Sequence, residues 1–412
     1  MTKVAIVDGY STGSVLGRTL YERAAHLVHV QSADHVPDYF RRAFRPGDYR
    51  ADLGYVADLE TLIGGLAGIG VDQVVAGTES GVILADTLNH RLGTPSNSPH
   101  LVTARRDKSL MAQAVAAAGL ATPRGQVFDT VAQAVAWYTA SPFDEAVVKP
   151  IDSAGTDNVW FCAGAEQVRL ACERVLGGQN LYGKSNTQVL VQERVRGTEV
   201  YANTVSHEGV HRVAEMWRYI KRAGPTGTPV YDYEEPVDVG SAEAEGIRRF
   251  VFAVLDALGI RSSAAHTEIM LTERGPVLIE TGARLGGVTM PDVVEKFSGV
   301  SQTALLADTL LDRASLAAFD DRKVRWAATV RNVALINSTA TIVHSTDWIS
   351  RIAELPSCVA VAANPVVGAE MFRTVDLISS PGFVYLASED SREVDRDYRK
   401  LRQLEQFGLY SQ

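Results

Sequence analysis

The sequence is poor in cysteine and has fewer basic than acidic residues. The three cysteines, Cys162, Cys172 and Cys358, have neither the spacing of a metal site nor the even number of a disulfide framework. No stretch approaches the roughly 18 apolar residues of a transmembrane helix, and the first apolar run is too short for a signal peptide. A net charge of −9 argues against nonspecific binding of nucleic acid. We therefore expect a cytoplasmic protein that acts on small molecules and binds neither membranes nor nucleic acid.

What is present is an ordinary globular composition with alternating strands and helices. The chain is 46% hydrophobic and 22% charged, and its 412 residues suffice for two or three domains. Apolar runs at 4–7, 27–31 and 71–76 alternate with helix-like segments, which predicts a parallel α/β sheet. Short strands and helices between about 122 and 194 predict a small α+β unit, and antiparallel strands at 199–205 and 210–218 follow it. The expected fold class is therefore α/β and α+β.

The loop after the first strand reads D-G-Y-S-T-G and carries Gly9 and Gly13, with Gly17 following. Their spacing of four does not match the G-x-G-x-x-G of dinucleotide-binding proteins. Two interpretations stay open. Either the loop is a strand-to-helix turn, or its backbone N–H groups face a substrate at a helix N-terminus.

Two carboxylates are expected to meet on one hairpin. A three-residue loop at 273–275 places Met270 opposite Leu278. The same register places Glu268 directly opposite Glu280, where the two carboxylates repel each other. A Mg²⁺ ion bound by both and by substrate phosphates would remove this repulsion. The alternative is a structural ion pair between one glutamate and Arg284 or a lysine.

A magnesium ion with phosphates implies a nucleotide. Lys149 ends the run A-V-V-K-P and precedes I-D-S-A-G-T-D, a combination that suits a phosphate cradle. Lys108, on a helix expected at 105–119, is a weaker candidate, since an isolated helical lysine usually faces solvent. Glu193 and Glu199 flank a break between two strands, where a hinge could hold adenine and a carboxylate could hold the ribose. Taken alone, these two glutamates would be surface charges.

In chain order these motifs resemble the ATP-grasp superfamily. The order is Lys108, K-P with S-A-G-T-D, Q-E-R-V-R-G-T-E, H-T-E-I-M-L and I-E-T-G-A-R-L-G-G. The segment at 215–233, with A-H-T-E and R-L-G-G, is similar more narrowly to the L-amino acid ligases, which make dipeptides. The resemblance implies an ATP-grasp fold in three parts: a pre-ATP-grasp domain at 1–100, a core at 101–312 with a mobile lid at about 122–193, and a C-terminal domain at 313–412.

The resemblance also implies roles for individual residues. By the resemblance, Lys108 and Lys149 would contact the phosphates or the adenine of ATP, and Ser153, Ala154 and Gly155 would form a lid loop over the phosphates. Glu193 and Val195 would lie at a hinge beside the adenine, and Glu199 would lie near the ribose. Glu268 and Glu280 would hold Mg²⁺, and Arg284 would steady an acyl phosphate. The superfamily usually has Asn two residues after the second metal-binding Glu, whereas this chain has Gly282. The second Mg²⁺ would then use water or both oxygens of Glu280, or would bind weakly, or the enzyme would be impaired.

The implied activity is that of an ATP-dependent carboxylate–amine ligase. An amino acid carboxylate would be phosphorylated by ATP, and the acyl phosphate would then react with an amine, giving ADP and phosphate. His266 is a candidate base or else a core histidine. The candidates for the substrate pocket are Gly286, Gly287 and Val288, with Arg218 and Lys221, which otherwise form a solvated basic loop.

Two alternatives stay open. One is a ligase of natural-product biosynthesis, such as antibiotic synthesis, that acylates a carrier-protein thiol or a specialised amine. The other is a nucleotide-binding protein without catalysis, which Gly282 alone favours. A homodimer is expected from the resemblance only.

Overall fold

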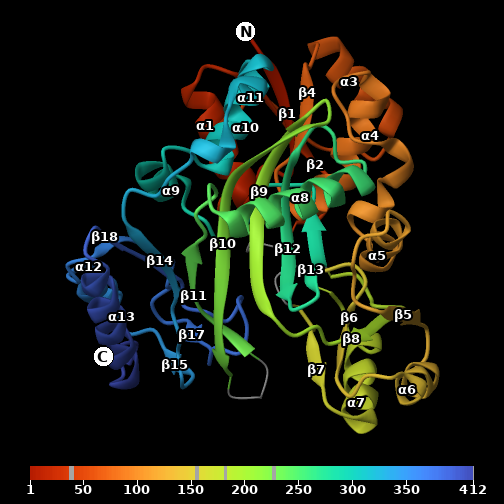
Figure 1. The fold of residues 1–412 in the computed structure, drawn as a ribbon. Coiled ribbons are helices and arrows are strands. Elements are labelled where there is room, and N and C mark those ends of the chain that lie inside the picture. The colour runs from red at the N-terminus through yellow and green to blue at the C-terminus, as the bar shows by residue number, and fades with distance from the viewer. Residues whose placement is uncertain (37–40, 154–156, 181–182, 225–228, 412) are drawn as a thin grey trace.

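The structure is a computed structural model that describes residues 1–411 except 37–40, 154–156, 181–182 and 225–228. An amino-terminal α/β unit, a small antiparallel unit and a long central sheet follow one another along the chain (Figure 1). The expected fold class, α/β and α+β, is confirmed. Among the helices that the structure describes, none combines the length and the apolar character needed to cross a membrane.

The amino-terminal unit is a parallel sheet, as the alternation of strands and helices predicts. Its strand order is β3-β2-β1-β4, and all adjacent strands are parallel. The elements are β1 (Lys3–Val7), α1 (Thr12–Glu22), β2 (His26–Gln31), β3 (Ala51–Tyr55), α3 (Leu59–Ile69), β4 (Gln73–Ala76) and α4 (Val82–Leu92). Helix α1 packs on one face of β1, while α3 and α4 pack on the other. This two-sided cover explains why β1 reads as a continuous apolar run.

The glycines after β1 are required for packing. A Cβ atom on Gly9 would lie 2.1 Å from the Tyr49 hydroxyl, and one on Gly17 would lie 2.9 Å from it. A Cβ atom on Gly13 would lie 2.6 Å from the Cα of Gly77, which follows β4. These contacts favour the strand-to-helix turn over a substrate loop.

The second unit is an antiparallel sheet in the order β5-β8-β6-β7. It consists of β5 (Gly125–Phe128), α6 (Val131–Ala140), β6 (Ala146–Pro150), β7 (Trp160–Cys162), α7 (Ala165–Leu176) and β8 (Val189–Glu193). Both helices share one apolar core with the sheet. These residues correspond to the predicted lid, whose mobility stays a prediction.

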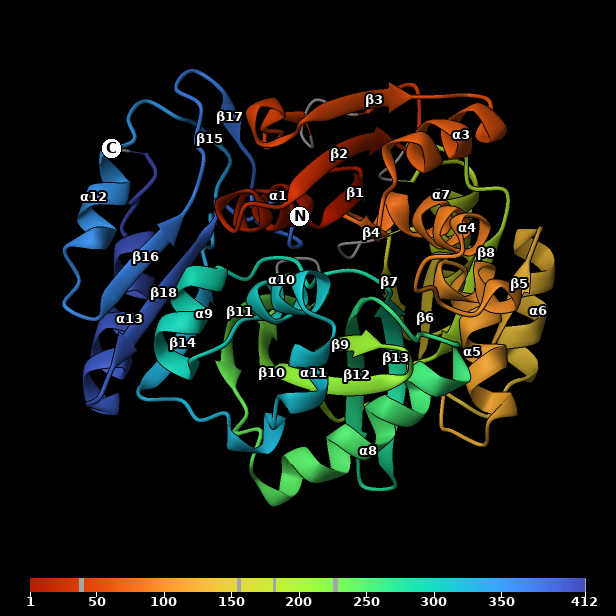
Figure 2. The same cartoon turned by 90° about the horizontal axis from the view of Figure 1, so that it is seen from above.

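The central sheet has eight strands in the order β13-β12-β9-β10-β11-β14-β18-β16. Its first five are β9 (Thr198–His207), β10 (Val210–Ala223), β11 (Pro229–Pro236), β12 (Ala264–Thr272) and β13 (Gly275–Gly282). Helix α8 (Ala242–Ala257) packs on one face, and α10 (Gln302–Leu311) lies between the other face and α1. Figure 2 shows the amino-terminal strands above this sheet, with α10 between them.

The carboxy-terminal residues extend the same sheet. They contribute β14 (Thr329–Ala334), β16 (Cys358–Ala362) and β18 (Phe383–Ser388), together with a two-stranded sheet of β15 (Thr341–Ile342) and β17 (Glu370–Met371). Further helices are α9 (Pro291–Ser298), α11 (Ala314–Ala318), α12 (Asp347–Ala353) and α13 (Ser391–Gln406). Strands on both sides of residue 312 pair with one another, while the predicted domain boundaries stay predictions.

The hairpin of β12 and β13 corrects one expectation and bears out another. The predicted three-residue loop is wrong, because Thr272 pairs with Gly275 and the loop is Glu273–Arg274. Gly275 has φ +108°, a conformation that glycine adopts without strain and that permits the tighter turn. A bulge at Ile279 then shifts the register back, so Glu268 does lie opposite Glu280.

The helix expected at 105–119 begins later, as α5 (Lys108–Ala117). Asp107 is its N-cap, and its carboxylate accepts hydrogen bonds from the backbone N–H groups of Ser109 and Leu110 at 2.8 and 3.0 Å. Capping therefore fixes Lys108 as the first helical residue and leaves Arg105 in a preceding turn.

Arg105 anchors this turn, and its loss should destabilise the protein. Its buried guanidinium donates to Asp86 at 2.6 Å and to the Leu258 carbonyl at 2.8 Å. Arg105→Met is expected to lower the free energy of unfolding by about 3–5 kcal/mol, because the Asp86 carboxylate stays buried without its partner. Urea unfolding measures this change.

Arg91→Met is the matched control for this prediction. Arg91 forms an exposed ion pair with Glu60 at 2.8 Å, so its loss should cost about 1 kcal/mol or less. Equal losses in the two variants would contradict the anchoring role of Arg105.

Candidate active site

The two predicted metal ligands lie on one face of the central sheet. Glu268 accepts a hydrogen bond from the Tyr219 hydroxyl at 3.2 Å and lies 3.4 Å from Nε2 of His266. Burial raises the pKa of Glu268, but the hydrogen bond from His266 and its charge outweigh burial and hold that pKa below its ordinary value. Glu280 forms an ion pair with Nζ of Lys108 at 2.8 Å. Both the expected juxtaposition of the glutamates and a lysine partner for one of them are therefore present.

This arrangement fits a magnesium ion that takes part of its coordination from a substrate. Mg²⁺ prefers oxygen ligands and is commonly held by one or two carboxylates plus phosphates and water. Within the described ranges, no cluster of three or more His, Cys, Asp or Glu side chains could hold a metal ion. Glu268 and Glu280 are therefore suitable ligands for Mg²⁺ only together with phosphate or water oxygens.

Lys149 supplies a buried positive charge beside these carboxylates. It lies in β6 of the second unit and is 5% exposed. Burial lowers the pKa of its ammonium group to about 8, a change that the charge of Glu280 opposes and that of Lys108 reinforces. A bound phosphate would favour the charged form of Lys149. Position and charge thus agree with the predicted phosphate contact.

Lys108 connects the loop that follows β6 to Glu280. Besides Glu280, its Nζ donates to the carbonyl oxygen of Ser153 at 2.7 Å. The Ser153 hydroxyl in turn donates to Asp157 at 2.6 Å. Ala154 and Gly155, the other predicted residues of this loop, lie outside the described residues.

Glu199 and Lys221 lie on the same side of the site. Nζ of Lys221 is 2.8 Å from Oε2 of Glu199 and 4.4 Å from the centre of the Tyr231 ring. The charge of Glu199 also acts on Lys149. The structure therefore brings together eight predicted residues: Lys108, Lys149, Ser153, Glu199, Lys221, His266, Glu268 and Glu280.

Glu193 ends β8 and Val195 lies between β8 and β9, where the second unit joins the central sheet. The Glu193 carboxylate accepts hydrogen bonds from the backbone and guanidinium of Arg124 at 3.0 and 2.9 Å. Burial raises the pKa of Glu193, but Arg124 outweighs burial and lowers it. This location is compatible with an adenine hinge, which stays a prediction.

Arg218 is not brought together with the other candidates. Arg218 and Lys221 both belong to β10, so the alternative of a solvated basic loop is wrong. Neighbouring side chains of a strand point to opposite faces. The Tyr219 hydroxyl reaches Glu268, whereas Arg218 pairs with Glu243 of α8 at 2.9 Å on the other face.

His266 and Gly286 both lie beside Asn203. Nδ1 of His266 lies 2.7 Å from Oδ1 of Asn203. A Cβ atom on Gly286 would lie 2.5 Å from the same oxygen, whereas one on Gly287 would meet nothing within 4 Å. A side chain at position 286 would therefore collide with Asn203 beside the histidine, whereas the space next to Gly287 is open.

Val288 has the left-handed φ of 65°. A β-branched residue in this conformation costs about 1–3 kcal/mol and persists where the surroundings impose it, often at a functional site. The strain is consistent with the predicted position of Val288 beside a substrate pocket.

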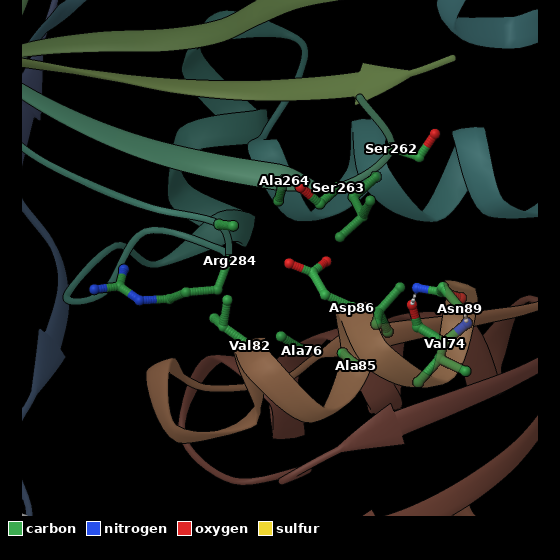
Figure 3. Close-up of a pocket in the computed structure, with 13 residues that line it drawn as sticks. Val74, Ala76, Val82, Ala85, Asp86, Asn89, Ser262, Ser263, Ala264 and Arg284 are labelled. Carbon is green, nitrogen blue, oxygen red and sulfur yellow. Dashed lines mark hydrogen bonds between the residues drawn. The ribbon is translucent and has the colours of Figure 1, made fainter. Parts of the chain in front are cut away.

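Arg284 follows β13 and extends over the start of α4. Figure 3 shows its side chain above Val82, with the guanidinium directed away from Asp86. Its Nε donates to Oε2 of Glu79 at 2.7 Å, and Nη1 donates to the Leu285 carbonyl at 2.8 Å.

Two buried residues of this site were not predicted from the sequence. Glu79, in the turn η2 (Glu79–Gly81), pairs with both Arg284 and Arg106. It follows the carboxyl end of the parallel strand β4, the edge at which open α/β sheets bind ligands. That rule was the available signal for Glu79. Arg106 lies two positions before Lys108 in the sequence but belongs to no recognised motif.

A third unpredicted residue is Glu234 of β11. Its buried carboxylate accepts hydrogen bonds from Tyr201 at 2.9 Å and Asn332 at 3.2 Å. Burial raises the pKa of Glu234 to about 7, although these hydrogen bonds oppose the increase, and the charge of Glu268 raises it further. Glu234 thus lies near Glu268, and its partners among the described residues are hydrogen-bond donors rather than a cation.

Comparisons with known proteins agree with this geometry. A family model described as an ATP-grasp domain matches residues 143–292, a range that includes Lys149, Glu268, Glu280 and Arg284. Over 407 residues the chain is 30% identical to dapdiamide A synthase of Enterobacter agglomerans, covering 98% of this chain and 95% of that protein. The chain belongs to the ATP-grasp family. The predicted superfamily is therefore confirmed.

Solved structures show the same fold for this ATP-grasp protein. The L-amino acid ligase of Bacillus licheniformis superposes with a TM-score of 0.75 at 18% identity, covering 98% of this chain and 97% of that one. The biotin carboxylase domain of the Hydrogenobacter thermophilus 2-oxoglutarate carboxylase, solved with MgADP, gives a TM-score of 0.62 at 13% identity, covering 94% and 87%.

Proposed function

We propose that this ATP-grasp protein is an ATP-dependent carboxylate–amine ligase that joins the carboxylate of an amino acid to an amine, such as a second amino acid. The supporting observation is the convergence of Lys108 and Lys149 on Glu268 and Glu280, with Arg284 at the end of the same hairpin. The similarity to dapdiamide A synthase favours a role in natural-product biosynthesis. ATP and Mg²⁺ are the proposed cosubstrate and metal. A cytoplasmic location and a homodimer stay predictions.

In the first step, a carboxylate oxygen of the substrate attacks the γ-phosphorus of ATP and ADP departs. Lys149 and Lys108 neutralise phosphate charge and fix the orientation of the phosphates, which supplies most of the catalysis of phosphoryl transfer. Held by Glu268 and Glu280, Mg²⁺ would add further neutralisation of the same oxygens.

In the second step, the amine attacks the acyl carbon and phosphate departs. Arg284 stabilises the negative charge that develops on oxygen. The amine must lose a proton. When Nδ1–H is donated to Asn203 and Glu268 turns from Nε2 to the metal, Nε2 of His266 is unprotonated and accepts this proton.

Glu234 supports an amino acid as the activated substrate. Its carboxylate is buried near Glu268, and a substrate ammonium group placed there would restore charge balance. A free α-amino group on the carboxylate substrate is therefore part of the proposal.

The test is ADP release with ATP, Mg²⁺ and pairwise mixtures of the twenty amino acids, with product masses read from the active wells. A product at the summed mass less one water supports the ligase and identifies both substrates. ADP without a dipeptide would favour the thiol or specialised-amine acceptor. ATP binding without ADP under any mixture would favour a protein without catalysis.

Val288 is expected to leave room for a first amino acid larger than Gly or Ala. Wild-type activity should therefore extend to Val- or Leu-sized substrates. Val288→Phe should shift the ratio of kcat/KM values towards Gly and Ala by about 10-fold or more, since single methylenes are worth about 10–200-fold in such pockets. Val366→Phe, at a 53% exposed position, is the control. Wild-type activity confined to Gly and Ala would contradict this prediction.

A further inference from the structure

A residue of the amino-terminal unit occupies the space that a side chain at position 282 would fill. Gly282 ends β13 without a left-handed φ, so its backbone conformation does not require glycine. A Cβ atom at this position would lie 2.6 Å from Oε2 of Glu79 and 3.5 Å from Nε of Arg284. The absence of a side chain here therefore makes room for the contact between Glu79 and Arg284.

Glu79 binds two arginines with its two carboxylate oxygens. Oε2 accepts the Nε–H of Arg284 at 2.7 Å, and Oε1 lies 2.8 Å from Nη1 of Arg106. Glu79 is 8% exposed. Burial would raise its pKa, but the charges of Arg284 and Arg106 outweigh burial and lower the pKa to about 2. The carboxylate is therefore ionised at neutral pH and holds both guanidinium groups.

The contacts continue from Arg106 into the second unit. Nη2 of Arg106 donates to the carboxylate of Asp152, in the loop that follows β6. Asp152 directly precedes Ser153, whose carbonyl oxygen accepts from Lys108. Ion pairs thus connect Arg284 on the central sheet to the phosphate-side loop through Glu79.

We infer that Glu79 is a positioning residue for the ligase reaction, which holds Arg284 in its active orientation and links it through Arg106 to the loop at Asp152. This inference rests on the proposed function, because that function gives Arg284 its catalytic role. With Nε held by Glu79 and Nη1 by the Leu285 carbonyl, the guanidinium plane has a fixed orientation. Donors fixed in advance need no reorganisation when charge develops in the transition state.

The first test is kinetic. Glu79→Gln is expected to lower kcat by about 10- to 100-fold, because small misplacements of a catalytic group cost up to about that factor. KM for ATP should change less than threefold, about 0.6 kcal/mol, since the lysines that hold the phosphates are untouched. Equal losses in kcat and in affinity for ATP would indicate a structural ion pair only and would overturn the inference.

The second test uses the space at Gly282. Gly282→Ala should displace the Glu79 carboxylate and lower kcat about 10-fold or more, without removing any charged group. Gly246→Ala is the matched control, because a Cβ atom on Gly246 in α8 meets nothing within 4 Å. Wild-type kcat in Gly282→Ala would overturn the inference.

The third test does not depend on catalysis. In protein labelled with ¹⁵N at arginine Nε, the Arg284 Nε–H signal is assigned by its loss in Arg284→Lys. A hydrogen bond to carboxylate should slow its exchange with water, and Glu79→Gln should shift the signal and speed the exchange. An unchanged signal would overturn the inference even in an active enzyme. If the wild type forms no ADP, the proposed function fails, whereas this signal still decides whether Glu79 holds Arg284.

Discussion

Replacing Glu280 by glutamine is expected to reduce the rate of ADP formation by more than about 100-fold, because metal-site partners that act only indirectly already cost about 10–100-fold. The amide keeps the shape of the side chain but loses the charge that holds Mg²⁺. The measurement is the steady-state rate of ADP formation at saturating ATP and amino acids, repeated over a range of Mg²⁺ concentrations. The apparent affinity for Mg²⁺ should fall with the rate.

Glu273→Gln is the control on the same hairpin, since Glu273 lies in the exposed loop. It should leave both the rate and the Mg²⁺ dependence unchanged. Far-ultraviolet circular dichroism and thermal unfolding establish that the Glu280 variant stays folded. Near-normal turnover in that variant would exclude a metal role for Glu280.

The ion pair between Lys108 and Glu280 makes this experiment decisive between two interpretations. In a structural ion pair, Lys108→Met and Glu280→Gln should each destabilise the protein, and neither should change its dependence on Mg²⁺. In the proposed site, the pair balances charge when phosphates and metal are absent. When ATP and Mg²⁺ bind, Glu280 can turn to Mg²⁺ and Lys108 can turn to phosphate. A change in Mg²⁺ affinity confined to Glu280→Gln therefore favours the metal site.

The sequence predicted the carboxylate pair because strand alternation is a local property. Residues two apart share a face, so the expected loop at 273–275 placed Glu268 opposite Glu280. The loop itself was predicted wrongly, because the tighter turn has no clear sequence signal. The pairing of the two glutamates is kept only because the bulge at Ile279 compensates for that turn. The shift in register caused by the shorter loop and the opposite shift caused by the bulge therefore cancel at Glu268 and Glu280.

The unpredicted part of the site depends on contacts between distant segments. Glu79 and Arg284 are separated by 205 positions, and a single sequence does not show which segments meet. Arg218 was predicted as a substrate contact because its segment is basic. The alternation of side chains along β10 instead directs Arg218 towards Glu243 of α8. The face to which each side chain points depends on where β10 begins and on its bulges, and composition does not reveal either.

Replacing Arg284 by lysine is expected to lower kcat by about 100- to 1,000-fold, the cost of removing one preorganised donor to a developing oxyanion. Lysine keeps the positive charge but lacks the planar fork that binds two oxygens at once. It also cannot reproduce both contacts of Arg284, the one to Glu79 and the one to the Leu285 carbonyl. The ratio of dipeptide to ADP should fall as well, because an acyl phosphate that is poorly held is lost to water.

Arg392→Lys is the control for this prediction, as the Arg392 side chain is 89% exposed on the carboxy-terminal helix. The two kinetic readouts separate the roles that Arg284 could have. A loss of kcat with an unchanged ratio of dipeptide to ADP places Arg284 in the phosphoryl transfer step alone, whereas a fall in both places it in the amide-forming step. Wild-type rates in Arg284→Lys would remove Arg284 from the mechanism. The contacts of Glu79 and the missing side chain at Gly282 would then serve only to hold the amino-terminal unit against the central sheet.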